Sequence, residues 1–206
     1  MVENAETAVH AGVILAGGLS RRLGGGDKCL LPLGGRPLLA HVIERVRPQV
    51  SLLALNANGD ATRFRDFGLA VVADDAADFA GPLAGILAAM DWAKSAQPSA
   101  AAVLTVPADT PFLPRDLAAR LKAARLNAAG APALARSGGR IHPVVGLWPL
   151  ALRDDLHAAL RRDGIRKVED WTRRLNPALV DFENGPIDPF FNINTPANLE
   201  RAAALL

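Results

Sequence analysis

One short segment of the chain concentrates residue types that bind phosphate. Residues 15–28 contain five glycines, two arginines and one lysine. Glycine lets the backbone approach a ligand closely, and its N–H groups can surround phosphate oxygens. Arg22 and Lys28 add positive charge that can neutralise a triphosphate. The segment lacks the Gly-Lys-Ser/Thr ending of a P-loop, so it predicts a phosphate-binding loop of another kind. A glycine-rich surface loop with solvated arginines is the alternative.

Amide and carboxylate side chains follow three other apolar runs. Asn56 comes directly after one and Asp74 two residues after another, and both residue types also form turns and helix caps. The Asp74 carboxylate can accept hydrogen bonds from guanine N1–H and its 2-amino group, a pair of donors that cytosine and uracil lack. Asp109 follows the most apolar run and is expected at the centre of the sheet. A carboxylate facing a triphosphate is a natural Mg²⁺ ligand, although Asp109 can instead cap the turn before Pro111.

Three later polar residues are further candidates. Asn192 and Asn194 lie on one face of an extended segment, because alternate residues of such a segment share a face. They can contact a ligand or the surroundings of Mg²⁺, or cap the last helix. His142 begins an apolar run and is either a hydrogen-bonded structural histidine or a substrate contact. Residues 81–85, Gly-Pro-Leu-Ala-Gly, can face an anion at a helix N-terminus, or let the helix approach the sheet closely.

Short apolar runs predict the strands that position these candidates. They are too short for helices and are rich in leucine and β-branched residues. The runs are Gly12–Leu15, Ser51–Leu55, Leu69–Val72, Ala101–Val106, Pro132–Ala135, Val144–Trp148 and Ala178–Phe182. Helical patterns alternate with them, and we expect a proline at the first helical position in four cases: Pro37, Pro82, Pro114 and Pro149. A last helix is predicted to begin at Pro196, with Thr195 as its N-cap.

The alternation of strands and helices predicts an α/β fold with three layers. Its central sheet is mostly parallel, with a short antiparallel part around a hairpin tip at residues 137–140. Ligands of such sheets bind at the carboxyl ends of the strands, where the candidate residues lie. We expect residues 1–206 to form a single domain, with residues 1–11 as an N-terminal extension.

Composition excludes several classes of protein. The chain has 206 residues, a formal net charge of +2 and one cysteine, Cys29. The charge is too small to indicate nucleic-acid binding, and one cysteine allows neither an internal disulfide nor a cysteine-rich zinc site. No apolar run of 18 residues predicts a membrane span, and the first residues do not resemble a signal peptide. We therefore expect a cytoplasmic protein.

The motif Leu15-Ala16-Gly17-Gly18-x-x-x-Arg22-x-Gly24-x-x-Asp27-Lys28 resembles the signature of nucleotidyltransferases with a Rossmann-like fold. Other segments make the resemblance narrower, and together they resemble the molybdenum cofactor guanylyltransferases from about Gly12 to Leu199. These segments are Asn56-Ala57-Asn58, Gly81-Pro82-Leu83-Ala84-Gly85, Pro107-Ala108-Asp109-Thr110-Pro111-Phe112 and Phe191-Asn192-Ile193-Asn194-Thr195-Pro196.

The resemblance implies transfer of GMP from GTP to the terminal phosphate of molybdopterin or the molybdenum cofactor, with release of pyrophosphate. It implies Mg²⁺ held by Asp109, and catalytic roles for Arg22, Lys28 and Asp109. The nucleotide-binding residues it implies are Leu15, Ala16, Gly17, Gly18, Lys28, Asn56, Asp74 and Asp109. It also implies transient contact with a molybdenum-insertion protein and with maturation factors of molybdoenzymes. The pterin is expected over the later half of the sheet, near Arg136, Arg140, His142 and Trp148.

Three alternative functions stay open at this point. Cytidylyltransferases for the same cofactor usually read Leu-Ala-Ala-Gly and Asp-Gln-Pro, where this chain has Gly17-Gly18 and Asp109-Thr110-Pro111, a difference that favours guanine. Sugar-phosphate nucleotidyltransferases share the first loop but usually have longer chains. A non-catalytic nucleotide-binding module could lack Lys28 or Asp109, and both residues are present here.

Overall fold

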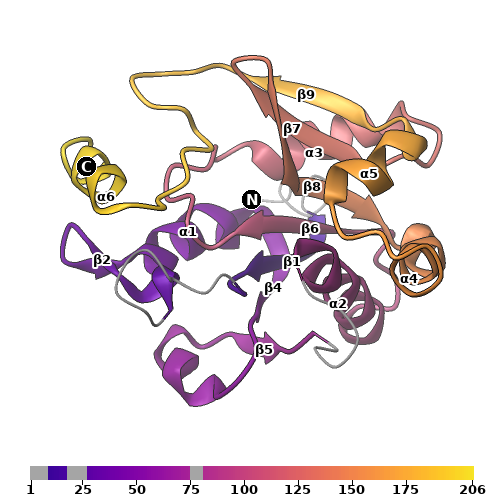
Figure 1. Cartoon of the computed structure of the whole chain (residues 1–206), viewed down its shortest axis with the longest axis horizontal. Helices are drawn as coiled ribbons and strands as arrows, with labels where there is room; N and C mark the ends of the chain where they lie inside the picture. The colour runs from indigo at the N-terminus through magenta and orange to yellow at the C-terminus, as the bar shows by residue number, and fades with distance from the viewer. Residues whose placement is uncertain (1–8, 18–26, 75–80) are drawn as a thin grey trace, which may run out of the picture.

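The structure is a computed structural model that describes residues 9–17, 27–74 and 81–206 (Figure 1). Its main sheet has seven strands in the order β5-β4-β1-β6-β8-β7-β9. All seven predicted strands are confirmed, with small shifts of their ends. Their bounds are β1 Val9–Leu15, β4 Val50–Asn56, β5 Ala70–Val72, β6 Ala102–Pro107, β7 Ala133–Ser137, β8 Arg140–Pro149 and β9 Ala178–Phe182. A small hairpin of β2 (Pro32–Leu33) and β3 (Arg36–Pro37) was not expected.

The sheet is parallel except around β8. This strand runs antiparallel to both β6 and β7, which confirms the predicted antiparallel part. Ser137 pairs with Arg140 across the hairpin tip, where Gly138 and Gly139 have φ of +51° and +77°. Two consecutive left-handed residues form the kind of tight turn that favours glycine. The pairing of β6 with β8 begins at Thr105 and Gly146, so the amino half of β8 extends beyond the carboxyl end of β6.

Helices cover both faces of the sheet, and each face has its own apolar core. Val13 and Ile14 of β1 are both fully buried but belong to different cores, because successive side chains of a strand point to opposite faces. One core includes residues of α1 (Leu38–Val46) and α3 (Leu117–Leu126). The other includes residues of α2 (Pro82–Ala96) and α4 (Arg153–Arg161), which lie together to the right of the sheet in Figure 1. The predicted three-layer α/β architecture is therefore confirmed.

The helix starts confirm the proline prediction only in part. Pro82 opens α2, and Pro196 opens α6 (Pro196–Ala203), where the Thr195 hydroxyl accepts a hydrogen bond from the Asn198 N–H at 3.2 Å. The prediction is wrong for the other three. Pro37 still has the extended conformation of β3 (ψ 143°) and only precedes α1. A turn separates Pro114 from α3 at Leu117, and Pro149 precedes a 3₁₀ turn that leads into α4.

The five-residue helix α5 (Val168–Thr172) was not predicted, since so short a segment shows no helical periodicity. In the part of the chain that the structure describes, no helix has the length and apolar character needed to cross a lipid bilayer.

The close packing of β8 between β6 and β7 can be tested at Gly146. A Cβ at this position would lie 2.7 Å from Leu134 Cδ2 and 3.1 Å from the Ala133 carbonyl oxygen. We expect Gly146→Ala to lower the free energy of unfolding by ~1–3 kcal/mol, since the neighbouring backbone cannot easily move. Chemical denaturation measures the change. The control is Gly185→Ala, whose Cβ has its nearest neighbour at 3.9 Å and is expected to cost less than ~0.5 kcal/mol. Equal stability of the two variants would contradict the packing argument.

Candidate active site

Lys28 and Asp109 form a largely buried ion pair. Lys28 begins a 3₁₀ turn (η1, Lys28–Leu30), and Asp109 follows the end of β6, the central strand of the seven. The Lys28 ammonium contacts Asp109 Oδ2, and the two side chains are only 14% and 13% exposed. Asp109 Oδ1 is buried and has no hydrogen-bond partner among the described residues. The carboxylate therefore faces Lys28 rather than capping the turn before Pro111, and it retains an oxygen that can bind a further group.

Two asparagines complete the surroundings of the Lys28 ammonium. Nζ donates to Asn194 Oδ1 at 2.6 Å and reaches Asn192 Oδ1 at 3.4 Å. Between them, Ile193 is fully buried on the opposite face of the segment, and its N–H donates to the Asp109 carbonyl oxygen at 3.0 Å. The predicted extended segment with both amides on one face is thus confirmed. An ammonium has three N–H donors, and Asp109 and the two asparagines occupy them.

A second polar cluster holds Asp74 at the carboxyl end of β5. The Asn56 side chain is 2% exposed, and its Nδ2 donates to Asp74 Oδ1 at 2.9 Å and to the Val72 carbonyl at 3.0 Å. Asn58 Oδ1 accepts from the Asp74 N–H at 3.0 Å. The side chains of both asparagines therefore position Asp74, whose Oδ2 has no hydrogen bond to any described residue.

Gly85 of α2 packs directly against this cluster. A Cβ on Gly85 would lie 2.7 Å from Asn56 Oδ1 and 3.3 Å from Leu15 Cδ2. Any larger residue would push Asn56 away from Asp74. The close helix–sheet contact predicted for residues 81–85 is therefore confirmed.

The first turn after β1 lies between the two clusters. The Ala16 N–H donates to the Asn56 carbonyl at 2.8 Å, and the Leu15 carbonyl accepts from the Ala108 N–H at 3.0 Å. Gly17 is exposed, and within the described residues no heavy atom lies within 4 Å of the place where its Cβ would be. The turn is thus bound on one side to the strand that ends at Asn56 and on the other to the residue before Asp109. Gly18 and Arg22 lie outside the described residues.

A polar cleft adjoins the Lys28 cluster. It has a volume of about 440 Å³ and is lined by Asn192 and Asn194, by the amino half of β8 and by Phe190 and Phe191. Arg140 and His142 line it, as the sequence predicted for residues near a second ligand.

Two residues expected near the pterin do not reach this cleft. Trp148 is fully buried, and its Nε1 donates to Thr105 Oγ1 at 2.7 Å. Arg136 forms an ion pair with Asp181, and this hydrogen bond raises the pKa of the guanidinium. Both side chains are held by partners on neighbouring strands, and neither is among the residues that line the cleft.

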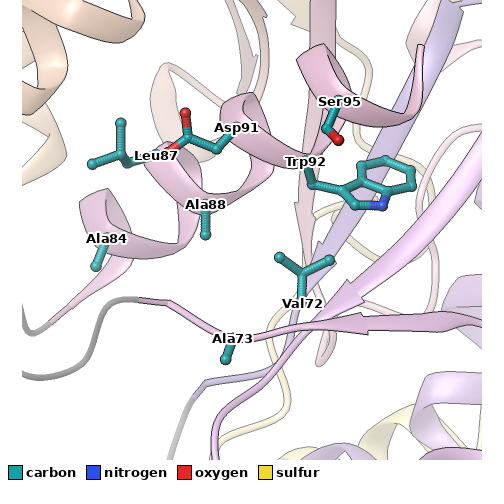
Figure 2. Close-up of a pocket in the computed structure, with 8 residues that line it drawn as sticks. All are labelled: Val72, Ala73, Ala84, Leu87, Ala88, Asp91, Trp92 and Ser95. Atoms are coloured by element: carbon teal, nitrogen blue, oxygen red, sulfur yellow. The ribbon is translucent and has the colours of Figure 1, made fainter.

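A second cleft lies between β5 and α2 and has a different character. Figure 2 shows its lining, which is mostly apolar and includes Trp92, Leu87 and Val72; its volume is about 340 Å³. Asp91 is the one charged residue among those that line it, and its carboxylate pairs with Arg153 at 2.7 Å. A cleft of this kind offers nothing that would bind phosphate, so the polar cleft beside Lys28 is the better candidate for a substrate.

Two sets of side-chain contacts near the site were not predicted from the sequence. Arg63 binds the Asp27 carboxylate and also donates to the Asn58 carbonyl at 2.6 Å, which connects the start of η1 with the Asp74 cluster. Ser137 and Asp188 hydrogen-bond to each other at 2.8 Å. These partners are far apart in the sequence, and no local pattern points from one to the other.

Three comparisons place the chain among known proteins. Residues 12–177 match a family model described as the MobA-like NTP transferase domain. A molybdenum cofactor guanylyltransferase of Bradyrhizobium sp. (strain ORS 278) is 54% identical over 205 residues, 100% of this chain and 96% of the relative. A molybdenum cofactor guanylyltransferase of Rhodopseudomonas palustris (strain HaA2) is 53% identical. The match covers 94% of this chain and 90% of that relative. The structure of molybdopterin-guanine dinucleotide biosynthesis protein A from Archaeoglobus fulgidus superposes with a TM-score of 0.72 at 23% identity, covering 95% and 97% of the two chains.

Cys29 lies next to Lys28 but is a poor nucleophile. Burial, with the Asp27 carboxylate as the next cause, raises the pKa of its thiol to about 12. At pH 8 the thiol is therefore almost wholly protonated, and the thiolate is the reactive form. We expect iodoacetamide to alkylate the folded protein at least ~100-fold more slowly than the denatured chain, as measured by mass spectrometry. Comparable rates in the two states would show that Cys29 is accessible and ionised.

Proposed function

The chain belongs to the MobA-like NTP transferase family, and from this membership we propose that it transfers GMP from GTP to the terminal phosphate of the molybdenum cofactor and releases pyrophosphate. The observation that carries the proposal is the convergence of the first turn, the Lys28–Asp109 pair and the Asn56–Asp74 pair at one edge of the sheet. A triphosphate, a metal-binding carboxylate and a base-binding carboxylate can meet there.

The nucleotide lies along the first turn in this proposal. The backbone of Leu15, Ala16 and Gly17, continued by Gly18, approaches the nucleotide, and exposed Gly17 leaves room for it. Asp74 accepts hydrogen bonds from guanine N1–H and the 2-amino group. Asn56 acts by holding Asp74, because both hydrogen bonds that its Nδ2 donates are made within the protein.

Lys28 binds the phosphates, with Arg22 as a second cation. Asn192 and Asn194 hold the Lys28 ammonium in place before the nucleotide arrives. The contact to Asn192, at 3.4 Å, is the longer of the two and is the one that a phosphate oxygen replaces, so that only a small rearrangement is needed to stabilise the charge that develops on pyrophosphate. The terminal phosphate of the pterin attacks the α-phosphorus of GTP in line. A phosphate monoester is already anionic near neutral pH, so the protein supplies position and charge rather than a covalent nucleophile.

Asp109 fits a magnesium ion. Its Oδ1 is buried without a hydrogen-bond partner in the described part of the chain, and Mg²⁺ in such enzymes binds one or two carboxylates together with substrate phosphates. When bound, Mg²⁺ supplies charge neutralisation and orientation of the phosphoryl oxygens. Asp109 would then offset part of the positive charge of Lys28 and the metal, and the substrate phosphates would offset the rest.

The acceptor occupies the 440 Å³ cleft beside Lys28. Asn192 and Asn194 line this cleft and also bind the Lys28 ammonium, so they lie between the two substrates. Arg140 and His142 contact the acceptor farther from the phosphates.

We further propose that residues 1–206 act as one nucleotidyltransferase domain in the cytoplasm. Delivery of the cofactor by a molybdenum-insertion protein, and hand-over to maturation factors of molybdoenzymes, follow from the same function.

The first test is pyrophosphate release with molybdenum cofactor, Mg²⁺ and each nucleoside triphosphate. We expect release with GTP only. Lys28→Ala and Asp109→Asn should lower kcat by about 10²–10³-fold, because each removes charge that acts on the reacting phosphates. Lys94→Ala, on the exposed side of α2, is the matched control and should keep wild-type activity. Circular dichroism checks the fold of each variant. Normal GMP transfer by Asp109→Asn would remove its proposed role.

Base selection is tested separately at Asp74. Asp74→Asn presents an N–H₂ group where guanine also presents donors, so kcat/KM for GTP should fall by about 10–100-fold. The loss should be smaller with inosine triphosphate, which lacks the 2-amino group. Asp66→Asn, an exposed carboxylate elsewhere, serves as the control. Unchanged GTP kinetics in Asp74→Asn would assign guanine recognition to other residues.

A further inference from the structure

Three polar side chains from separate segments meet at one wall of the acceptor cleft. Ser137 ends β7, His142 lies in the amino half of β8, and Asp188 belongs to the loop after β9. Ser137 Oγ lies 2.7 Å from His142 Nε2 and donates to Asp188 Oδ1 at 2.8 Å. Asp188 Oδ1 also accepts from the Phe190 N–H at 2.8 Å. We refer to Ser137, His142 and Asp188 as the histidine clamp.

The order of the histidine clamp excludes one chemistry that its residue types suggest. In a nucleophilic serine site, histidine lies between the serine and the carboxylate and removes the serine proton. Here serine lies between the other two, and Ser137 is 1% exposed. Its hydroxyl is therefore enclosed and donates to Asp188, so the clamp acts on the histidine and not on the serine.

Hydrogen-bond rules then determine which nitrogen of His142 carries the proton. A carboxylate only accepts, so the Ser137 hydroxyl hydrogen points to Asp188. The Ser137 oxygen is left as an acceptor for His142, and Nε2 must donate. In a neutral imidazole the other nitrogen is an acceptor. His142 Nδ1 is thus the lone-pair nitrogen, and no hydrogen bond to it occurs within the described residues.

The surroundings of the ring favour the neutral form. Burial lowers the pKa of His142, and Arg140 lowers it further, while Asp188 acts in the opposite direction. The ring of Phe190 lies against the imidazole with centroids 4.5 Å apart. The two rings are tilted by 37° and both line the cleft, together with Asp188 and Glu169, which gives this wall an aromatic surface beside hydrogen-bond acceptors.

Such a wall suits a fused heterocycle that carries hydrogen-bond donors. A pterin carries ring N–H and amino groups, which are donors, whereas the lone pair of a neutral imidazole offers nothing to a phosphate anion. At the opposite end of the cleft, Asn192 and Asn194 contact the Lys28 ammonium, which can bind a phosphate. The His142 end also has a cation, Arg140, but this end alone combines aromatic rings with acceptors for the N–H groups of a heterocycle.

On the basis of the proposed function, we infer that Ser137 and Asp188 hold His142 as the Nε2–H tautomer, so that Nδ1 accepts a hydrogen bond from an N–H of the pterin ring. This contact sets the direction in which the acceptor lies in the cleft, with its phosphate at Lys28. His142 is then a specificity-determining residue, and Ser137 and Asp188 are positioning residues that act through it.

The tautomer is tested by ¹⁵N nuclear magnetic resonance on the full chain. The chain has four histidines, and the His142 signals are those lost in His142→Asn. We expect a protonated Nε2 and an unprotonated Nδ1 in the wild type at pH 7.5, and a mixture of tautomers in Ser137→Ala. A protonated Nδ1 in the wild type would overturn the inference without reference to activity.

The role in acceptor binding is tested by steady-state kinetics with molybdenum cofactor and Mg²⁺-GTP. His142→Ala should raise the KM for the cofactor about tenfold, the effect of one lost hydrogen bond, and leave the KM for GTP within about twofold. His142→Asn should stay within about threefold of the wild type, because its amide oxygen can take the place of Nδ1. Ser137→Ala should lie between the two, and Ser95→Ala on α2 is the matched control with unchanged kinetics.

The possible failures are distinguishable. If the wild type forms no guanylylated product, the proposed function fails and the inference fails with it. If the wild type is active but His142→Ala leaves the cofactor KM unchanged, only the inference is overturned. An equal rise in both KM values, or a similar loss in His142→Asn and His142→Ala, would show that the histidine has a structural role alone.

Discussion

The site depends on a largely buried ion pair, Lys28–Asp109, in which only the lysine has all its hydrogen-bonding groups paired within the described residues. Burying two opposite charges costs desolvation energy, which is recovered only when their hydrogen-bonding groups find partners. Lys28 meets this requirement with Asp109, Asn192 and Asn194, but Asp109 Oδ1 finds no partner in the described chain. A pair retained for stability alone would have no reason to leave that oxygen unpaired. The imbalance is accounted for if a cation and a triphosphate complete the site.

The reversal of β8 explains how one sheet provides two binding regions. Parallel strands β1, β4, β5 and β6 bring Asn56, Asp74 and Asp109 to one edge through their carboxyl ends. An antiparallel strand reaches that edge with its amino end instead, and β8 extends beyond β6 there. This extension carries His142 and forms one wall of the acceptor cleft. In the proposed function, the nucleotide is thus associated with the parallel half of the sheet, and the acceptor with the antiparallel half.

Features determined by local sequence could be predicted, and features determined by pairing between distant segments could not. The apolar runs predicted all seven strands, and the polar residues after them predicted the meeting of Lys28 with Asp109. The pairing of Arg136 with Asp181 could not be predicted, because it is defined only by the register of β7 with β9. The burial of Trp148 could not be predicted either, because it depends on the pairing of the far end of β8 with Val103 inside the core.

The two binding regions are connected through the backbone of Asp109 and not only through its carboxylate. The Asp109 carbonyl accepts from Ile193, which fixes the segment that carries Asn192 and Asn194. The preceding residue, Ala108, donates to Leu15 at the start of the first turn. A displacement of the end of β6 would therefore move both the first turn after β1 and the wall of the acceptor cleft. In the proposed reaction, the acceptor phosphate and the α-phosphate of GTP must be aligned within a fraction of an ångström. Support of both binding regions by the central strand favours this alignment more than two independent loops would.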